Sequence, residues 1–145
     1  MQKKAVKTKN APEAIGPYSQ GIDTSSFVFT SGQLPINPTD GLLIKDNIKL
    51  ATKQALENVK AILEEAGTSM DKVVKTTVFL IDLNDFAVMN EVYASFFTEN
   101  YPARSAIQVA KLPLDAIIEI EAILIILSTS CKGIPNSLAI SQFCG

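Results

Sequence analysis

Apolar residues recur every three or four positions in the stretch from residue 47 to residue 67, which predicts an amphipathic helix. The members of its apolar face are Ile48, Ala51, Ala55, Val59, Ile62 and Ala66. Asp46 or Asn47 can cap the start of this helix, and Gly67 supplies a stop. The opposite face is charged, so the helix should pack on one side only.

A second helical pattern follows Asp82 or Asn84, either of which can act as its cap. One side of this predicted helix carries a stripe of large, mostly aromatic residues, which we call the aromatic stripe: Phe86, Met89, Tyr93, Phe96 and Phe97. We interpret the stripe as core packing rather than a ligand site, because aromatic side chains contribute strongly to protein cores. Asn90 lies beside the stripe and can face either way.

Runs of β-branched and apolar residues predict strands at 5–8, 19–23, 27–31, 73–81, 104–110 and 116–127. Proline and glycine place loops at 11–18 and 34–41, and the turn KLPLD joins the last two strands. This order of strands, helix, strand, helix and strands predicts an α+β two-layer sandwich with both helices on one face of a mixed sheet. Residues 1–127 should form a single domain.

Residues 128–145 lose this periodicity and are rich in serine, glycine and proline, so we expect a mobile or loosely docked tail. The tail holds both cysteines, Cys131 and Cys144. Their spacing matches no metal or redox motif, and thiols in such a tail are more often bystanders than a bridge.

The formal net charge of −2 and the pI of about 5.1 provide no general attraction for nucleic acid or anionic membranes. No run reaches the ~18 continuous apolar residues of a membrane span, and the first residues lack the apolar run of a signal peptide. We therefore expect a cytoplasmic protein without a membrane partner, and the net charge disfavours a nucleic-acid partner.

Histidine is absent from the chain, which excludes Ser-His-Asp, Cys-His and histidine-metal chemistry as intrinsic activities. Ser19, Ser31 and Ser105 have no histidine to activate them. The glycines are too scattered for a phosphate-binding loop. A metal site made of carboxylates alone could start from Glu119 and Glu121, but no other ligand clusters with them.

The last predicted strand has two apolar faces. One face carries Ile118, Ile120, Ala122, Leu124 and Ile126, and the other carries Ile117, Glu119, Glu121, Ile123, Ile125 and Leu127. If the helices cover the first face, the second is too apolar to meet water and needs another layer. Since the chain has no further helix, we predict a homo-oligomer whose sheets pack across the interface.

Charged residues interrupt these apolar strands. Glu119 and Glu121 would lie on one face about 7 Å apart, within or beside the predicted interface. Arg104 opens the preceding strand, and its guanidinium can hold a carboxylate through two parallel hydrogen bonds. An interfacial Arg-Glu salt bridge and a ligand site both fit this pattern, because both use charges in unusual surroundings.

Several segments together resemble the Rid family, also called YjgF, of reactive-intermediate deaminases. They are APEAIGPYSQG, FTSGQLPINP, NVKAILEEAG, VVKTTVFLIDLNDFAVMNEVYASFF and, most specifically, YPARSAIQVAKLP followed by IEIEA. The resemblance covers residues 10–127. It implies a chorismate-mutase-like α+β fold that assembles as a trimer, with three equivalent sites in the clefts between subunits.

The resemblance also implies a reaction, namely hydrolysis of enamines and imines such as 2-aminoacrylate to a 2-keto acid and ammonia, without cofactor or metal. Carried over by position, Arg104 would bind the substrate carboxylate. The backbone of Ala106 would contact the imine nitrogen, and Glu119 would orient or activate water. Tyr18, the turn of Ser31 and Gly32, and Asn90 match the remaining pocket positions. An imine is already electrophilic, so it needs only orientation, a proton and a placed water.

Many members of the family have cysteine where this chain has Ala106, so a thiol-dependent role at that position is absent here. The sequence is also compatible with two other functions. One is a regulatory module that binds small carboxylates without turnover. The other is translation inhibition or RNA cleavage, an old description of related proteins that fits poorly with a pI of about 5.1.

Overall fold

The computed structural model describes residues 2–126. The predicted tail at 128–145, its two cysteines and Leu127 lie outside the described residues. The strands are β1 (Lys4–Val6), β2 (Gly21–Asp23), β3 (Phe27–Thr30), β4 (Val73–Leu80), β5 (Ala103–Gln108) and β6 (Ile118–Ile125). The helices are α1 (Ile48–Glu65) and α2 (Phe86–Ala94), with short 3₁₀ turns η1 (Met70–Lys72), η2 (Leu83–Asp85) and η3 (Pro113–Asp115).

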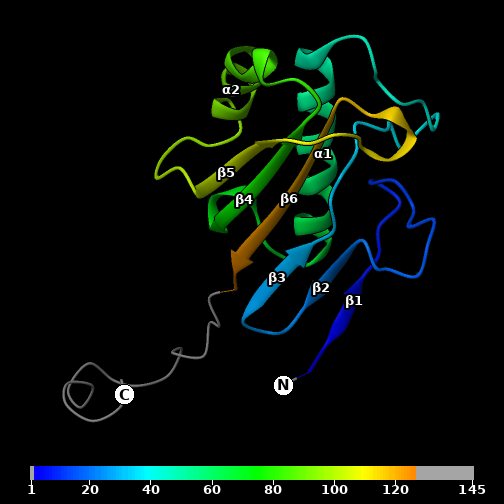
Figure 1. Cartoon of the computed structure of the whole chain (residues 1–145). Helices are drawn as coiled ribbons and strands as arrows, with labels where there is room; N and C mark the ends of the chain where they lie inside the picture. Colours follow the sequence, from blue (N-terminus) through cyan, green and yellow to red (C-terminus); the bar gives the residue numbers. More distant parts are fainter. Residues whose placement is uncertain (1, 127–145) are drawn as a thin grey trace.

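The strands form one mixed six-stranded sheet in the order β1-β2-β3-β6-β4-β5 (Figure 1). β4 and β5 are parallel, as required by the α2 crossover between them, and the other neighbouring pairs are antiparallel. The consecutive strands β2 and β3 form an antiparallel hairpin. The last strand in sequence, β6, lies between β3 and β4 and so connects the N-terminal strands β1 to β3 with the strands β4 and β5.

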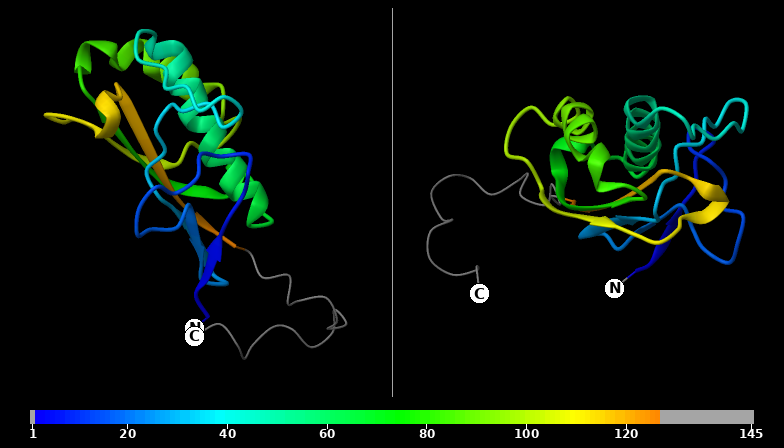
Figure 2. Two further views of the ribbon diagram at one scale, coloured as in Figure 1. Left: turned by 90° about the vertical axis from the view of Figure 1, so that its right-hand side faces the viewer. Right: turned by 45° about the horizontal axis from the view of Figure 1, so that its top comes forward.

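Both helices cover the same face of the sheet, which confirms the predicted two-layer α+β arrangement (Figure 2). Of the two possible caps for α1, Asn47 is the one used, and its side chain accepts a hydrogen bond of 3.0 Å from the Leu50 amide. The helix stops before Gly67, which adopts a φ of +80° that strongly favours glycine.

The second helix, α2, is shorter than the aromatic stripe predicted. It ends at Ala94, so Phe96 and Phe97 lie beyond the helix. The expected cap is also wrong, because the Asp82 side chain caps the 3₁₀ turn η2, and α2 begins after this turn without a side-chain cap. Asp82 accepts from the Asn84 amide at 2.8 Å, which favours a tight turn before the helix.

Burial along β6 alternates as predicted. Ile118, Ile120, Ala122 and Leu124 are almost completely buried beneath the helices, whereas Glu119, Glu121 and Ile123 are partly exposed on the other face. We call this second face the open face of the sheet. Aromatic and aliphatic side chains continue across it, because Phe27 pairs with Ile125 and Phe29 pairs with Ile123 on the neighbouring strand.

Phe27 and Phe29 are each 42% exposed, and Ile125 is 37% exposed. The open face of the sheet therefore exposes several large apolar side chains on neighbouring strands, a feature that is common at interaction sites. Among residues 2–126, no helix is both long and apolar enough to cross a membrane.

Candidate functional site

A cavity of about 900 Å³ lies where two N-terminal loops and the turn η3 meet the start of β6. Its walls are formed chiefly by Ile15, Tyr18, Ser31, Gly32, Leu114, Glu119 and Glu121. Four of the residues expected at the site are therefore neighbours here. They are Tyr18, Ser31, Gly32 and Glu119, and we call them the carboxylate half-site.

Glu119 is the chemically distinctive member of the carboxylate half-site. Its carboxyl group is partly buried, and burial raises its pKa above the ordinary value, with the negative charge of Glu121 adding to the effect. Gly32 lies directly against this side chain. A Cβ atom added at Gly32 would overlap the carboxyl oxygen Oε1 and would lie 2.7 Å from Cδ and 2.9 Å from Cγ. Only glycine leaves room for Glu119 in this position.

The turn that contains Ser31 and Gly32 is fixed by hydrogen bonds to both of its sides. Gln33 exchanges backbone hydrogen bonds of 2.8 and 3.1 Å with Ile120, which attaches the turn to β6. The Gln33 side chain donates to the Ser31 carbonyl at 3.1 Å, and the Ser31 hydroxyl donates to the Ser19 carbonyl at 2.6 Å. The glycine that contacts Glu119 therefore has a defined position.

Buried amide side chains hold the two loops that surround the cavity. Gln20 is 4% exposed and binds the backbone of residues 8–12, donating to the carbonyls of Thr8 and Pro12 at 3.0 and 2.7 Å. Asn58 of α1 is completely buried and donates to the carbonyls of Leu34 and Ile36 at 3.0 and 2.9 Å. These hydrogen bonds satisfy carbonyl groups of the loop backbone and so hold the walls of the cavity in position.

Arg104 lies elsewhere in the fold. It pairs with Thr76 across β4 and β5, so it occupies the helix-covered face of the sheet. Its guanidinium carbon lies 4.6 Å from the ring centroid of Tyr93 and 5.4 Å from that of Phe86, both on α2. The Tyr93 hydroxyl is hydrogen-bonded to Thr76 at 2.6 Å, and burial raises the pKa of Tyr93. Two aromatic rings therefore support the arginine through cation-π contacts.

Asn90 and Ala106 belong to the same region as Arg104. Asn90 is spaced four residues after Phe86 and three before Tyr93, so the three share one face of α2. Ala106 follows Arg104 by two residues on β5 and packs against the main core. We call Asn90, Arg104 and Ala106 the arginine half-site.

The seven predicted site residues thus form two groups on opposite faces of one sheet. Glu119 pairs with Phe79 on the open face, whereas Arg104 pairs with Thr76 on the helix-covered face. Across the described part of the chain, no salt bridge joins Arg104 to Glu119 or Glu121. A single copy of the chain does not bring the two half-sites together.

The sequence pattern did not predict that aromatic residues of α2 contact Arg104. The aromatic stripe was interpreted as core, which is correct for Met89, Tyr93 and Phe97, since each is at most 6% exposed. Phe86 is 37% exposed, and its ring lies near Arg104. The helical spacing of Phe86 and Tyr93 shows that they share a face, but nothing in the pattern shows that an arginine approaches it. Glu121 was not among the predicted site residues, although it lines the cavity with Glu119.

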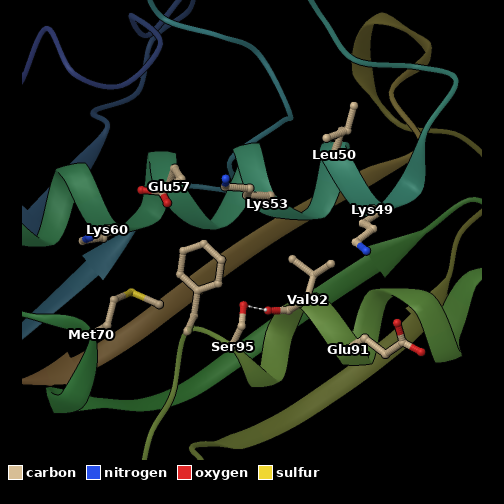
Figure 3. Close-up of a pocket in the computed structure, with 10 residues that line it drawn as sticks. Lys49, Leu50, Lys53, Glu57, Lys60, Met70, Glu91, Val92 and Ser95 are labelled. Atoms are coloured by element: carbon tan, nitrogen blue, oxygen red, sulfur yellow. Dashed lines mark hydrogen bonds between the residues drawn. The ribbon is translucent and has the colours of Figure 1, made fainter.

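A second cavity, of about 680 Å³, lies between α1 and α2 (Figure 3). Lys53, Glu57 and Lys60 alternate in charge along its α1 side, which is typical of a solvated helix face. On the α2 side the Ser95 hydroxyl donates to the Val92 carbonyl at 2.6 Å and so caps its own helix. This groove has the chemistry of a helix surface rather than of a reaction site.

In residues 2–126, no cluster of three or more His, Cys, Asp or Glu side chains could hold a metal ion. The fold and the candidate site together define a class of protein, namely a two-layer α+β protein whose candidate site residues offer carboxylate, arginine and backbone groups.

Residues 8–126 match the sequence model of the family described as Endoribonuclease L-PSP. The chain belongs to this family, which is the Rid or YjgF family. The resemblance noted in the sequence is thereby confirmed.

Relatives cover nearly the whole described chain. A RutC family protein of Pyrococcus abyssi is 55% identical over 123 residues, which span 85% of this chain and 97% of the relative. The 2-iminobutanoate/2-iminopropanoate deaminase of Escherichia coli is 53% identical over 123 residues, spanning 83% of this chain and 95% of the relative. Among solved structures, E. coli TdcF with bound serine superposes with a TM-score of 0.83 at 49% identity, covering 86% of this chain and 99% of TdcF.

Proposed function

We propose that the protein hydrolyses reactive 2-imino and 2-enamino acids of the 2-aminoacrylate type to 2-keto acids and ammonia. The observation that carries this proposal is Glu119, a partly buried carboxyl group with a raised pKa on the wall of a cavity. The deaminase activity in the name of a relative that is 53% identical supports the same chemistry. A carboxyl group with a raised pKa beside a cavity can orient water and transfer protons without histidine or metal.

Each half-site has a distinct part in the proposed reaction. Arg104, held against two aromatic rings, binds the substrate carboxylate through two parallel hydrogen bonds. The backbone of Ala106 contacts the nitrogen, and Asn90 completes this side of the pocket. On the other side, Glu119 activates the attacking water, while Tyr18 and the turn of Ser31 and Gly32 enclose the substrate.

We further propose that the chain assembles as a homotrimer in which the arginine half-site of one copy meets the carboxylate half-site of the next. Two observations support this assembly. The half-sites lie on opposite faces of the sheet in one chain. The open face also exposes Phe27, Phe29 and Ile125, which favours burial against another copy.

The activity is tested by measuring ammonia and keto-acid release from freshly generated 2-aminoacrylate. Arg104→Ala should lower kcat/KM by about 100-fold or more, the size expected when one partner of a desolvated charge pair is removed. Arg104→Lys should recover only part of this loss, because lysine cannot form the bidentate pair. Lys111→Ala removes an exposed cation and serves as the control. An Arg104→Ala protein as active as the parent excludes the proposed role.

The shared site is tested by mixing two inactive variants, Arg104→Ala and Glu119→Ala. After co-refolding at equal amounts, about a quarter of the sites in random trimers should combine an intact Arg104 from one copy with an intact Glu119 from its neighbour. Activity should therefore recover to about a quarter of the parent value. Sites built within one chain predict no recovery at all.

A binding module without turnover is the second candidate. The bound serine in E. coli TdcF favours a site for small carboxylates in that relative. If this candidate is correct, calorimetry with 2-ketobutyrate shows binding that Arg104→Ala removes, while the deaminase assay remains blank. RNA cleavage, which the family description names, is disfavoured by the net charge of −2.

A further inference from the structure

Glu121 shares the cavity wall with Glu119. The two residues are two positions apart on β6, so their side chains leave the same face of the sheet about 7 Å apart. Glu119 pairs with Phe79 and Glu121 with Thr77 on β4, which places both on the open face. Neither carboxyl group forms a salt bridge with a residue in the range 2–126.

Within one chain, the other ionisable groups around this pair do not neutralise it, and in the proposed assembly the Arg104 of the next copy is paired with the substrate carboxylate. From the N-terminal loop, Glu13 and Tyr18 line the same cavity. From β4, Lys75 is the cation on the open face, and its amino group donates to the Ser105 hydroxyl on β5 at 2.9 Å. β3 contributes only apolar side chains to this face. Partial burial and a neighbouring carboxylate without a cationic partner in the same chain both disfavour the charged form of Glu119.

We propose that Glu121 is a positioning residue whose negative charge keeps a proton on Glu119, and that Glu119 donates this proton to the carbon of the substrate enamine. The inference rests on the proposed function and deepens it. Burial and the charge of Glu121 both act in this direction, since both raise the pKa of Glu119.

In the proposed reaction Glu119 donates a proton twice and regains one twice, so it ends in its starting protonation state. Its carboxyl proton passes to the methylene carbon of 2-aminoacrylate, and the nitrogen lone pair forms the C=N bond of an iminium ion. Water then attacks C2 and returns a proton to the Glu119 carboxylate. Glu119 next protonates the amine, the C–N bond breaks to release ammonia, and the hydroxyl proton returns to Glu119 as the C=O bond forms.

The pH profile of kcat/KM provides the first test. If protonated Glu119 is required, activity falls as pH rises through its pKa. Glu121→Gln removes a charge about 7 Å away and should move this fall to lower pH by about one unit. Glu121→Asp restores the charge and should restore most of the parent profile. Glu91→Gln makes the same charge change on α2, in the groove between the helices, and should leave the profile in place.

Carbon-13 NMR titration of labelled glutamate carboxyl groups in the full chain provides a readout that does not depend on turnover. The Glu119 resonance should titrate at lower pH in Glu121→Gln than in the parent. Equal titration in the two proteins overturns the inference, whether or not the parent is an active deaminase. A shifted titration with an unshifted activity profile overturns the proton-donor role. A parent that titrates as expected but lacks deaminase activity contradicts the proposed function instead.

Discussion

The carboxylate half-site and the arginine half-site differ in construction. The carboxylate half-site combines two loops with the start of β6, and buried amides such as Gln20 and Asn58 hold these loops in place. The arginine half-site is built on two regular elements, β5 and α2, with Arg104 resting on aromatic rings. Because the sheet separates Arg104 from Glu119, the opposite charges do not neutralise each other within one chain. The side chains of Arg104 and Glu119 therefore both remain available for a ligand.

The largest expected effect comes from blocking the contact between the half-sites. Phe29→Asp places a charge in the exposed apolar surface of the open face, where its burial between copies would be very unfavourable. Sedimentation should show a shift from trimer to monomer, with deaminase activity lost in parallel. Leu42→Asp, at a position that is 66% exposed in a loop, should leave the mass unchanged. Full activity in a monomeric Phe29→Asp protein would contradict the shared site.

A smaller effect is expected from displacing Glu119 within its own half-site. Gly32→Ala forces the flexible Glu119 side chain aside, since the new Cβ would lie 2.7 Å from Cδ. We expect kcat/KM to fall about 10- to 100-fold with little change in Tm, because a general acid or base contributes about 100- to 10,000-fold and a displaced but intact carboxyl group retains part of this contribution. Gly67→Ala should lower Tm and leave kcat/KM unchanged. Its φ of +80° makes alanine cost about 1 kcal/mol of stability, and the position is far from the candidate site. Equal effects of the two variants on activity would refute the role of Gly32.

Weakening the aromatic support of Arg104 should have a moderate effect. Phe86→Leu removes one of the two ring contacts, worth about 0.5–1 kcal/mol at a partly exposed site, so KM should rise about 2- to 5-fold. Phe96→Leu makes the same change in the groove between α1 and α2 and should alter stability without altering KM. Steady-state kinetics on both variants separates the two outcomes, and a KM equal to that of the parent in Phe86→Leu excludes the supporting role.

The smallest effect concerns stability. The raised pKa of Glu119 means that the folded state binds its proton more tightly than the unfolded state, so stability falls as pH rises from the ordinary pKa through the folded value. Glu119→Gln removes this penalty and should be the more stable protein at pH 7, by no more than about 1 kcal/mol, because the group is only partly buried. The advantage should disappear below about pH 4, where both states are protonated.

Urea unfolding of parent and variant at both pH values measures this difference. Glu91→Gln, an exposed glutamate on α2, should show no pH-dependent gain. A Glu119→Gln protein that is less stable than the parent at pH 7 would show that the carboxylate is stabilised by its surroundings, contrary to the direction of its pKa shift.

The two half-sites also differ in how far they could be predicted. The alternation from Ile118 to Leu124 identified both faces of β6 and placed Glu119 on the open one. The short strand β5 offers no such signal, because its residues are all partly or fully exposed and show no clear alternation. The side of the sheet that Arg104 occupies became known only from its pairing with Thr76.

Local spacing in the chain was sufficient for the presence and order of the strands and helices and for the apolar character of the open face, since these depend on contacts within a few positions. The end and the cap of α2 were not predicted correctly, and the set of candidate site residues came from the resemblance to the Rid family. Long-range contacts were needed for the cavity, which combines Tyr18, Gly32, Leu114 and Glu119 from distant parts of the chain. They were also needed to show that Arg104 and Glu119 lie on opposite faces. The alternation of side chains along a strand is a local property, whereas strand order and loop packing depend on contacts between distant segments. These long-range contacts decide where the charged residues Arg104 and Glu119 lie.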